Sequence, residues 1–215
     1  MKLYGYFRSS AAFRVRIALN LKQLDYEQAS IHLRKNQQSA PEYLRLNPQA
    51  LVPTLEDEGH LVLSQSLAII EYLDETRPEP PLMPVAPLAR ARVRSLAQAI
   101  ACDIHPIDNL RVLRYLADPL GHDEKTVEAW FNHWIRLGFD AIERRLSSEA
   151  DTGRFCHGDA PGLADCCLVP QVVNAQRHKS FDFAPYPTIS RIFETCRAHP
   201  AIAAAFPERQ PDAEH

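Results

Sequence analysis

The first part of the chain alternates short apolar stretches with amphipathic ones, a pattern typical of a small mixed α/β domain. Residues 2–7 and 26–33 have the composition and alternation of strands, and residues 11–21 between them carry apolar side chains three and four positions apart. Further on, two short strands are expected on either side of the acidic turn at 56–59, and a helix begins near Gln65. The predicted order is therefore strand, helix, strand, short helix, two strands and helix.

A proline-rich stretch, RPEPPLMPVAPL at 77–88, follows this pattern. Proline lacks a backbone donor and breaks helices, so the stretch indicates a linker. Beyond it the sequence shows no convincing strand pattern. Apolar residues keep a helical spacing in four segments: 89–116, 125–146, 163–179 and 188–199.

These patterns predict a two-domain organisation. We expect an α/β domain at 1–80, a linker at 81–88 and an all-helical domain at 89–215. The length of 215 residues, 46% of them hydrophobic, suits one compact unit or two small domains.

Charge and hydropathy exclude several classes of function. The net charge of −3 provides no basic surplus for nucleic acid and no polybasic run for a membrane surface. Arg8, Arg14 and Arg16 interrupt the amino-terminal segment, which therefore does not resemble a signal peptide. No apolar run approaches the ~18 residues that a membrane-spanning helix needs.

The cysteines and histidines argue against a disulfide framework and a metal site. The five cysteines are odd in number and show no C-x-x-C spacing, so we expect free thiols and a cytoplasmic location. The nine histidines are scattered without the spacing of metal ligands, and no metal is predicted.

Two adjacent hydroxyls, Ser9 and Ser10, lie where the first predicted strand runs into the first helix. A serine at this position can simply cap the helix by accepting a backbone N–H. It can also hold an anion at the positive end of the helix. Gln65 and Ser66 begin another helix in the same domain. Two such helix ends suit a ligand with two anionic groups, such as a peptide with a carboxylate and a thiolate.

The segment Val52-Pro53-Thr54 opens a strand, where proline is confined to starts, edges and bulges. It is either a simple strand start or a cis peptide bond that turns the Val52 backbone outward to bind a ligand's main chain. Arg8 lies at the strand-to-helix corner, where side chains of a cleft are presented, although a solvated arginine is the usual case.

In the helical half, Cys102–Pro106 interrupts a helix, and proline there predicts a kink. His105 and Arg111 lie close to this kink, and His105 can equally be a structural histidine. Further along, Gly162 is expected to cap a helix with Asp165 as the acidic residue of a capping box, a role in folding.

Segments spread over essentially the whole chain carry a family resemblance: SSAAFRVRIAL at 9–19, LNPQALVPTL, QSLAIIEYLDETRP, CDIHPIDNLRVLRYL, GLADCCLVPQVVNAQR, PYPTI and the tail RQPD. They resemble the zeta class of glutathione transferases, which includes maleylacetoacetate isomerase and maleylpyruvate isomerase. The resemblance implies a thioredoxin-like domain that binds glutathione as cofactor, an all-α domain that binds substrate, and a homodimer.

The resemblance also implies roles for individual residues. Ser9 is similar to the family's catalytic hydroxyl, and Ser10 to its neighbour at the glutathione sulfur. Arginines that bind substrate carboxylates are matched by Arg8, Arg111 and Arg177, of which Arg8 and Arg177 are also expected to act in catalysis. The other matches to glutathione-binding positions are Gln38, Val52, Pro53, Gln65, Ser66, His105 and Asn109, and His105 is also expected to contact the substrate.

Two positions depart from the family pattern. The class often has Ser-Ser-Cys, whereas this chain has Ala11 in the third place, so a thiol there cannot be essential to its chemistry. Gly162 stands where Ser or Thr is frequent, and a glycine cap costs only about a few tenths of a kcal/mol relative to those residues.

The implied reaction is a cis–trans isomerisation of a maleyl diacid or keto-acid, with maleylacetoacetate favoured, in aromatic amino acid degradation. Thiolate addition makes the double bond single, the bond turns, and elimination gives the trans isomer. A free thiol has a pKa of about 8.5, so a hydrogen bond from Ser9 and the positive helix end are expected to favour the thiolate. Arginines would pair with the carboxylates. The alternatives are maleylpyruvate as substrate, a transferase acting on small α-halo acids, and a non-catalytic glutathione-binding protein.

Overall fold

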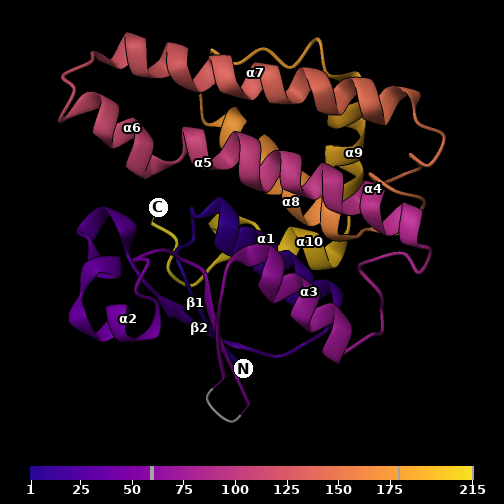
Figure 1. Ribbon diagram of the computed structural model, residues 1–215, viewed down its shortest axis with the longest axis horizontal. Coiled ribbons are helices and arrows are strands. Elements are labelled where there is room, and N and C mark those ends of the chain that lie inside the picture. Colours follow the sequence, from indigo (N-terminus) through magenta and orange to yellow (C-terminus); the bar gives the residue numbers. More distant parts are fainter. Residues whose placement is uncertain (59–60, 179, 215) are drawn as a thin grey trace. The chain divides into compact units, whose positions relative to one another are not determined.

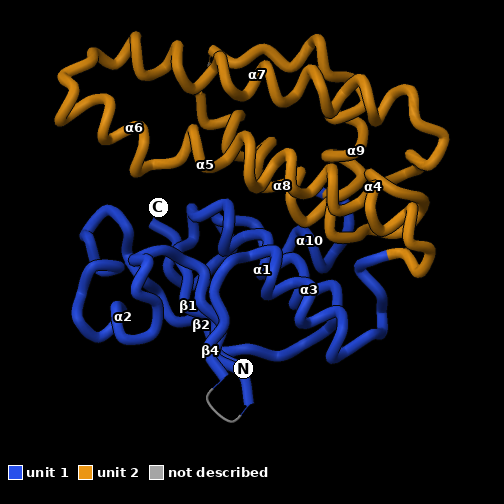
Figure 2. The backbone as a smooth tube through the Cα atoms, viewed as in Figure 1, with its two compact units in different colours: residues 1–83, 197–215 blue, residues 84–196 orange. Residues whose placement is uncertain are grey.

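The computed structural model describes residues 1–58, 61–178 and 180–214. It contains two compact units, Met1–Met83 with Arg197–His215, called unit 1, and Pro84–Cys196, called unit 2 (Figure 2). Gly59 of the predicted acidic turn, Lys179 at the end of a predicted helix and the terminal His215 lie outside the described residues.

Unit 1 is built on a four-stranded mixed sheet in the order β2-β1-β3-β4. β1 runs parallel to β2, with Lys2 opposite Glu27, and antiparallel to β3, with Leu3 opposite Leu55. β4 completes the sheet antiparallel to β3. The strands are β1 (Lys2–Gly5), β2 (Glu27–Ser30), β3 (Thr54–Asp57) and β4 (Leu61–Ser64).

The helices of unit 1 pack around α1, whose residues are almost all buried. α1 contacts both α3 and α10 (Figure 1). A Cβ at Gly5 would lie 3.2 Å from the Ala12 Cβ, so this glycine permits close packing of α1 on the sheet. The helices are α1 (Ser10–Leu21), α2 (Pro41–Leu46), α3 (Ser66–Thr76) and α10 (Pro200–Ala204), with 3-10 turns at Leu33–Lys35, Gln37–Ser39 and Pro207–Arg209.

Unit 2 is helical throughout its described secondary structure (Figure 1). Its most buried helix is α8, which packs against α4. The helices are α4 (Pro87–Gln98), α5 (His105–Asp108), α6 (Leu110–Ala117), α7 (Glu124–Ser148), α8 (Leu163–Gln176) and α9 (Pro187–Arg197), with a π-helix at Ala99–Ile104.

The predicted order of elements and the thioredoxin-like plus all-α fold class are confirmed. Two strand predictions were too long, because β1 ends at Gly5 and β2 at Ser30. The predicted interruption at Cys102–Pro106 of the helical stretch 89–116 is confirmed, since α4 is followed there by the π-helix, α5 and α6. Residues 197–215 cluster with unit 1, whereas the predicted helical domain at 89–215 included them.

Among the described residues, no helix combines the length and apolar character needed to cross a membrane.

Candidate functional site

Ser9 ends the turn after β1 and caps α1. Its backbone N–H donates to the Tyr6 carbonyl at 2.9 Å, and its Oγ accepts from the Ala12 N–H at 3.2 Å. A hydroxyl has two acceptor lone pairs and one O–H, so accepting this bond leaves the O–H available to donate. The capping interpretation and the anion-binding interpretation of Ser9 are therefore compatible. Ser10 is the first residue of α1 and is buried.

A buried arginine holds the same turn by hydrogen bonds to backbone carbonyls. Arg16 lies inside α1 and is fully buried. Its Nη2 donates to the Phe7 carbonyl at 3.0 Å, and its Nε donates to the Ala205 carbonyl at 3.1 Å. The charge of Arg16 therefore fixes the backbone two residues before Ser9.

The Val52–Pro53 peptide bond is cis, which confirms that part of the prediction. The preceding carbonyl, of Leu51, accepts hydrogen bonds from the Tyr43 hydroxyl at 2.6 Å and from Asn47 Nδ2 at 2.8 Å. Burial raises the pKa of Tyr43, so its hydroxyl stays protonated over the physiological range. These two side chains hold the backbone next to Val52. Binding of a ligand by the Val52 backbone stays a prediction.

The start of α3 is held by a second buried arginine. Arg14 of α1 donates from Nη1 to Ser66 Oγ at 3.2 Å, and both side chains are buried. Gln65, the residue before α3, has a backbone φ of 71°, a conformation that non-glycine residues adopt rarely and that clusters at functional sites. Its Nε2 donates to Gln49 Oε1 at 2.9 Å. A positive side chain thus reinforces the positive end of α3.

The sequence did not reveal the part played by Arg14 and Arg16, because arginine side chains are usually solvated. Both are buried, with 1% and 0% of their surfaces exposed. The available signal was their position within a helix whose other residues are mostly apolar, which left no polar face toward solvent.

Two further predicted residues of unit 1 lie near its surface. Gln38 is half-buried in a 3-10 turn, and its Nε2 donates to Asn36 Oδ1 at 3.0 Å. Arg8 is exposed, with its guanidinium 5.3 Å from the centroid of the Phe7 ring.

In unit 2, three predicted residues fall within one short stretch. His105 begins α5 directly after the π-helix and is half-buried. Asn109 caps α6, since its Oδ1 accepts from the Arg111 N–H at 3.1 Å and from the Val112 N–H at 3.4 Å. The Arg111 side chain is exposed.

The position of α5 is set by its neighbours in unit 2. Trp130 Nε1 donates to the Ile107 carbonyl at 3.0 Å, and Gln171 Nε2 donates to Asp108 Oδ2 at 3.2 Å. A Cβ at Gly138 of α7 would lie only 2.2 Å from Ile104 Cδ1. Glycine at 138 therefore makes room for the Ile104 side chain between α7 and the π-helix, and π-helical turns are frequent at functional sites.

Arg177 is the exposed C-cap residue of α8. The other end of α8 shows the predicted capping box residue, because Asp165 Oδ2 accepts from the Gly162 N–H at 2.9 Å. Asp165 Oδ1 also accepts from the Cys156 N–H at 2.9 Å. The buried Asp165 thus has the folding role that the sequence predicted.

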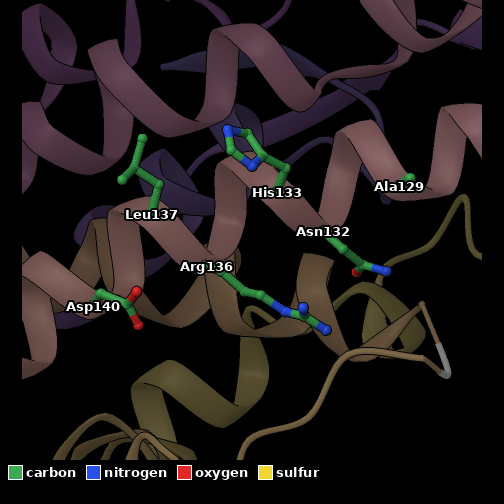
Figure 3. Close-up of a pocket in the computed structure, with 6 residues that line it drawn as sticks. All are labelled: Ala129, Asn132, His133, Arg136, Leu137 and Asp140. Atoms are coloured by element: carbon green, nitrogen blue, oxygen red, sulfur yellow. The ribbon is translucent and has the colours of Figure 1, made fainter.

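An open cavity of about 390 Å³ lies along α7 in unit 2. Figure 3 shows the side chains that line it projecting from this one helix. They are Ala129, Asn132, His133, Arg136, Leu137 and Asp140. None of them is a predicted site residue. In the part of the chain that the structure describes, no cluster of His, Cys, Asp or Glu could hold a metal ion.

Known proteins resemble this chain over its whole length. Residues 1–75 match the profile of the glutathione S-transferase N-terminal domain. A protein described as a probable maleylacetoacetate isomerase, from Vibrio cholerae, is 52% identical over 213 residues, covering 98% of this chain and 97% of the relative.

Two solved structures are also similar. One is a holo structure of maleylpyruvate isomerase, described as a bacterial zeta-class glutathione transferase, with 47% identity, a TM-score of 0.96 and complete coverage of both chains. The other is maleylacetoacetate isomerase from Anaeromyxobacter dehalogenans with dicarboxyethyl glutathione and citrate in the active site. It has 42% identity and a TM-score of 0.87, and the match covers 99% of this chain and 93% of that one.

A mixed four-stranded sheet with α1 and α3 against it, followed by helices, defines the glutathione transferase fold. Within this class, the chain belongs to the zeta class, the family of the maleylacetoacetate and maleylpyruvate isomerases.

Proposed function

We propose that the chain is a glutathione-dependent cis–trans isomerase of a maleyl keto-acid, with maleylacetoacetate converted to fumarylacetoacetate as the favoured reaction. The observation that carries the proposal is Ser9, whose Oγ caps α1 as an acceptor and keeps its O–H for an anion at the same helix end. The dicarboxyethyl glutathione bound to the Anaeromyxobacter relative supports it. Such a group is what a thiol forms when it adds to the double bond of a four-carbon unsaturated diacid.

The residues of unit 1 fit a tripeptide with two anionic groups. Bound glutathione would supply a thiolate that adds to the substrate's double bond, permits rotation about the resulting single bond and leaves again. Ser9 donates its O–H to the sulfur, and the start of α1 adds its dipole; both lower the thiol pKa. Ser10 assists beside it.

The γ-glutamyl end is assigned to the second helix start. There Gln65 and Ser66 receive its carboxylate, and the buried Arg14 behind Ser66 adds positive charge. The Val52 backbone, next to the cis bond to Pro53, binds the cysteinyl main chain. Gln38 from unit 1 and His105 and Asn109 from unit 2 complete the assigned contacts.

The substrate's carboxylates are assigned to Arg8, Arg111 and Arg177. All three residues are exposed. A guanidinium pairs with a carboxylate through two parallel hydrogen bonds, which fixes orientation as well as charge. Arg8 and Arg177 act on the negative charge that develops during addition, and Arg111 distinguishes substrates of different length.

The assembly and location follow the same proposal. We infer a homodimer, since closed two-fold dimers are the commonest soluble oligomers. Sedimentation at micromolar concentration would show the dimer, and a stable monomer would contradict it. The described structure holds all five cysteines as free thiols, which supports a reducing cytoplasm.

The test is the conversion of cis to trans keto-acid with glutathione at catalytic amounts. The proposal predicts many turnovers per glutathione, with both maleylacetoacetate and maleylpyruvate as candidates. A transferase acting on α-halo acids would consume one glutathione per halide released, and a binding protein would show neither reaction. No isomerisation of either substrate would contradict the proposal.

A further inference from the structure

The carboxyl-terminal segment of the chain returns to the turn that presents Ser9. Asp212 Oδ2 accepts a hydrogen bond from the Phe7 N–H at 3.1 Å, across 205 positions of sequence. The same oxygen accepts from Ser30 Oγ at 3.0 Å, and Oδ1 accepts from Gln28 Nε2 at 2.9 Å. One carboxylate therefore joins the end of β2 to the turn between β1 and α1.

Phe7 is held at both of its backbone polar groups by charged side chains. Its N–H donates to Asp212, and its carbonyl accepts from the buried Arg16. Hydrogen bonds to charged partners are stronger than those between neutral groups. Since the Ser9 N–H donates to the Tyr6 carbonyl, the residues just before Ser9 are fixed on both sides of the turn.

The segment that carries Asp212 is itself anchored. Gln210 is buried, and its Nε2 donates to the Ala204 carbonyl at 3.0 Å and the Phe206 carbonyl at 2.8 Å. Beyond Asp212, Ala213 packs against the cluster of Tyr6, Phe7, Tyr43 and Val52. The tail thus packs on the same apolar cluster as Phe7 and Val52.

We propose that Asp212 is a positioning residue for Ser9. It acts through the Phe7 peptide group, keeping the turn in the geometry that aims the Ser9 O–H at a sulfur held at the start of α1. This inference rests on the proposed function, because it concerns the same thiolate site. A displacement of about 1 Å at a reacting group can cost roughly 10²-fold in rate. Removal of the Asp212 carboxylate should therefore lower kcat and raise the thiol pKa of bound glutathione, with a smaller effect on the stability of the fold.

The variants are Asp212→Ala, which removes all three hydrogen bonds, and Asp212→Asn, which keeps one oxygen able to accept from Phe7. Glu208→Gln is the matched control, since Glu208 is an exposed acid four residues upstream. Three quantities are measured for each protein: kcat and KM for isomerisation, the thiol pKa of bound glutathione by ultraviolet titration of thiolate absorbance, and the melting temperature.

The expected result for Asp212→Ala is a kcat roughly 10-fold lower than in the wild type, with a smaller change in KM and a higher thiol pKa. These measurements are made at a temperature where the variant is fully folded. Asp212→Asn should fall between Asp212→Ala and the wild type, and Glu208→Gln should match the wild type.

A lower melting temperature with wild-type kcat and thiol pKa would show that Asp212 only stabilises the fold, and would overturn the inference. If Asp212→Ala does not fold, Asp212→Asn decides by the same two readouts. A wild-type protein that binds glutathione without lowering its thiol pKa would instead contradict the proposed function.

Discussion

The two units hold their site residues in different ways. In unit 1, Ser9 and Ser66 stand at helix starts that are braced by the buried Arg16 and Arg14. In unit 2, Arg111 and Arg177 are exposed at the start and end of helices. Buried charges with fixed partners favour one geometry, whereas interactions of exposed arginines are weakened by solvent.

This difference matches two tasks of the proposed reaction. Unit 1 would supply a thiolate, whose chemistry is the same for every substrate and requires a fixed donor. Unit 2 would select the acid, whose length differs between maleylacetoacetate and maleylpyruvate. We therefore expect changes at Ser9 in unit 1 to affect all substrates alike, and changes at Arg111 in unit 2 to affect them unequally.

The largest effect is expected from Ser9→Ala. Loss of one donor to a developing or resident anion typically lowers the rate by roughly 10²–10³-fold, and both substrates should lose activity equally. Ser10→Ala should cost less. Because Ser9 also caps α1, Ser9→Gly is the control for capping, since a glycine cap costs only about a few tenths of a kcal/mol. A greater loss from Ser10→Ala than from Ser9→Ala would reverse the two roles.

Gly138→Ala should disturb unit 2 without touching the thiolate site. The new Cβ would collide with the side chain of Ile104, which directly precedes His105, so either the Ile104 side chain or the π-helix must shift. We expect a loss of about 1–3 kcal/mol in the free energy of unfolding and a higher KM for substrate, with the affinity for glutathione less affected. Ile104→Ala in the same chain should relieve the collision. Denaturant unfolding and steady-state kinetics measure these effects, and unchanged stability would contradict the packing argument.

Arg111→Leu tests whether unit 2 discriminates between substrates. The kcat/KM values for maleylacetoacetate and maleylpyruvate should fall by different factors. The larger fall is expected for maleylpyruvate, because this shorter substrate needs its second carboxylate bound closer to the reacting double bond. Arg114→Leu is the matched control, an exposed arginine on the same helix. Equal losses for both substrates would remove Arg111 as the discriminating residue, and no loss would make it an ordinary surface arginine.

Asp57→Asn should have the smallest effect, a loss of stability at neutral pH that disappears as the pH falls. Burial raises the pKa of the Asp57 carboxyl, but hydrogen bonds from Tyr72, the Glu58 backbone and Arg77 outweigh burial and lower its pKa below 3.8. A depressed pKa stabilises the fold above the unfolded value near 3.8, and this stability is lost as the pH falls through the folded-state pKa. Unfolding measured against pH should show a shallower acid loss in the variant. An unchanged acid limb would mean that the Asp57–Arg77 pair contributes nothing.

Local features of the fold could be read from the sequence. The order of strands and helices follows from periodicity, and the cap at Gly162 and Asp165 from residues three positions apart. The position of Val52–Pro53 at a strand start is compatible with a cis bond or with a simple strand start. Each of these depends on neighbours along the chain, so the sequence carries the signal directly.

Features that depend on distant contacts could not be predicted. The close approach of Gly138 to the Ile104 side chain joins two different helical segments. The buried positions of Arg14 and Arg16 depend on acceptors at Ser66 and Ala205. The return of Asp212 to Phe7 spans almost the whole chain. In each case the residue type is compatible with several environments, and tertiary packing decides between them.

The central claim is that unit 1 alone sets the thiolate. It is tested most directly by titrating the thiol of glutathione bound to wild type, Ser9→Ala and Arg111→Leu. We predict a pKa below the free value of about 8.5 in wild type and in Arg111→Leu, and a return toward about 8.5 in Ser9→Ala. An unshifted thiol in the wild-type protein, or a shift lost equally in Arg111→Leu and Ser9→Ala, would contradict the claim.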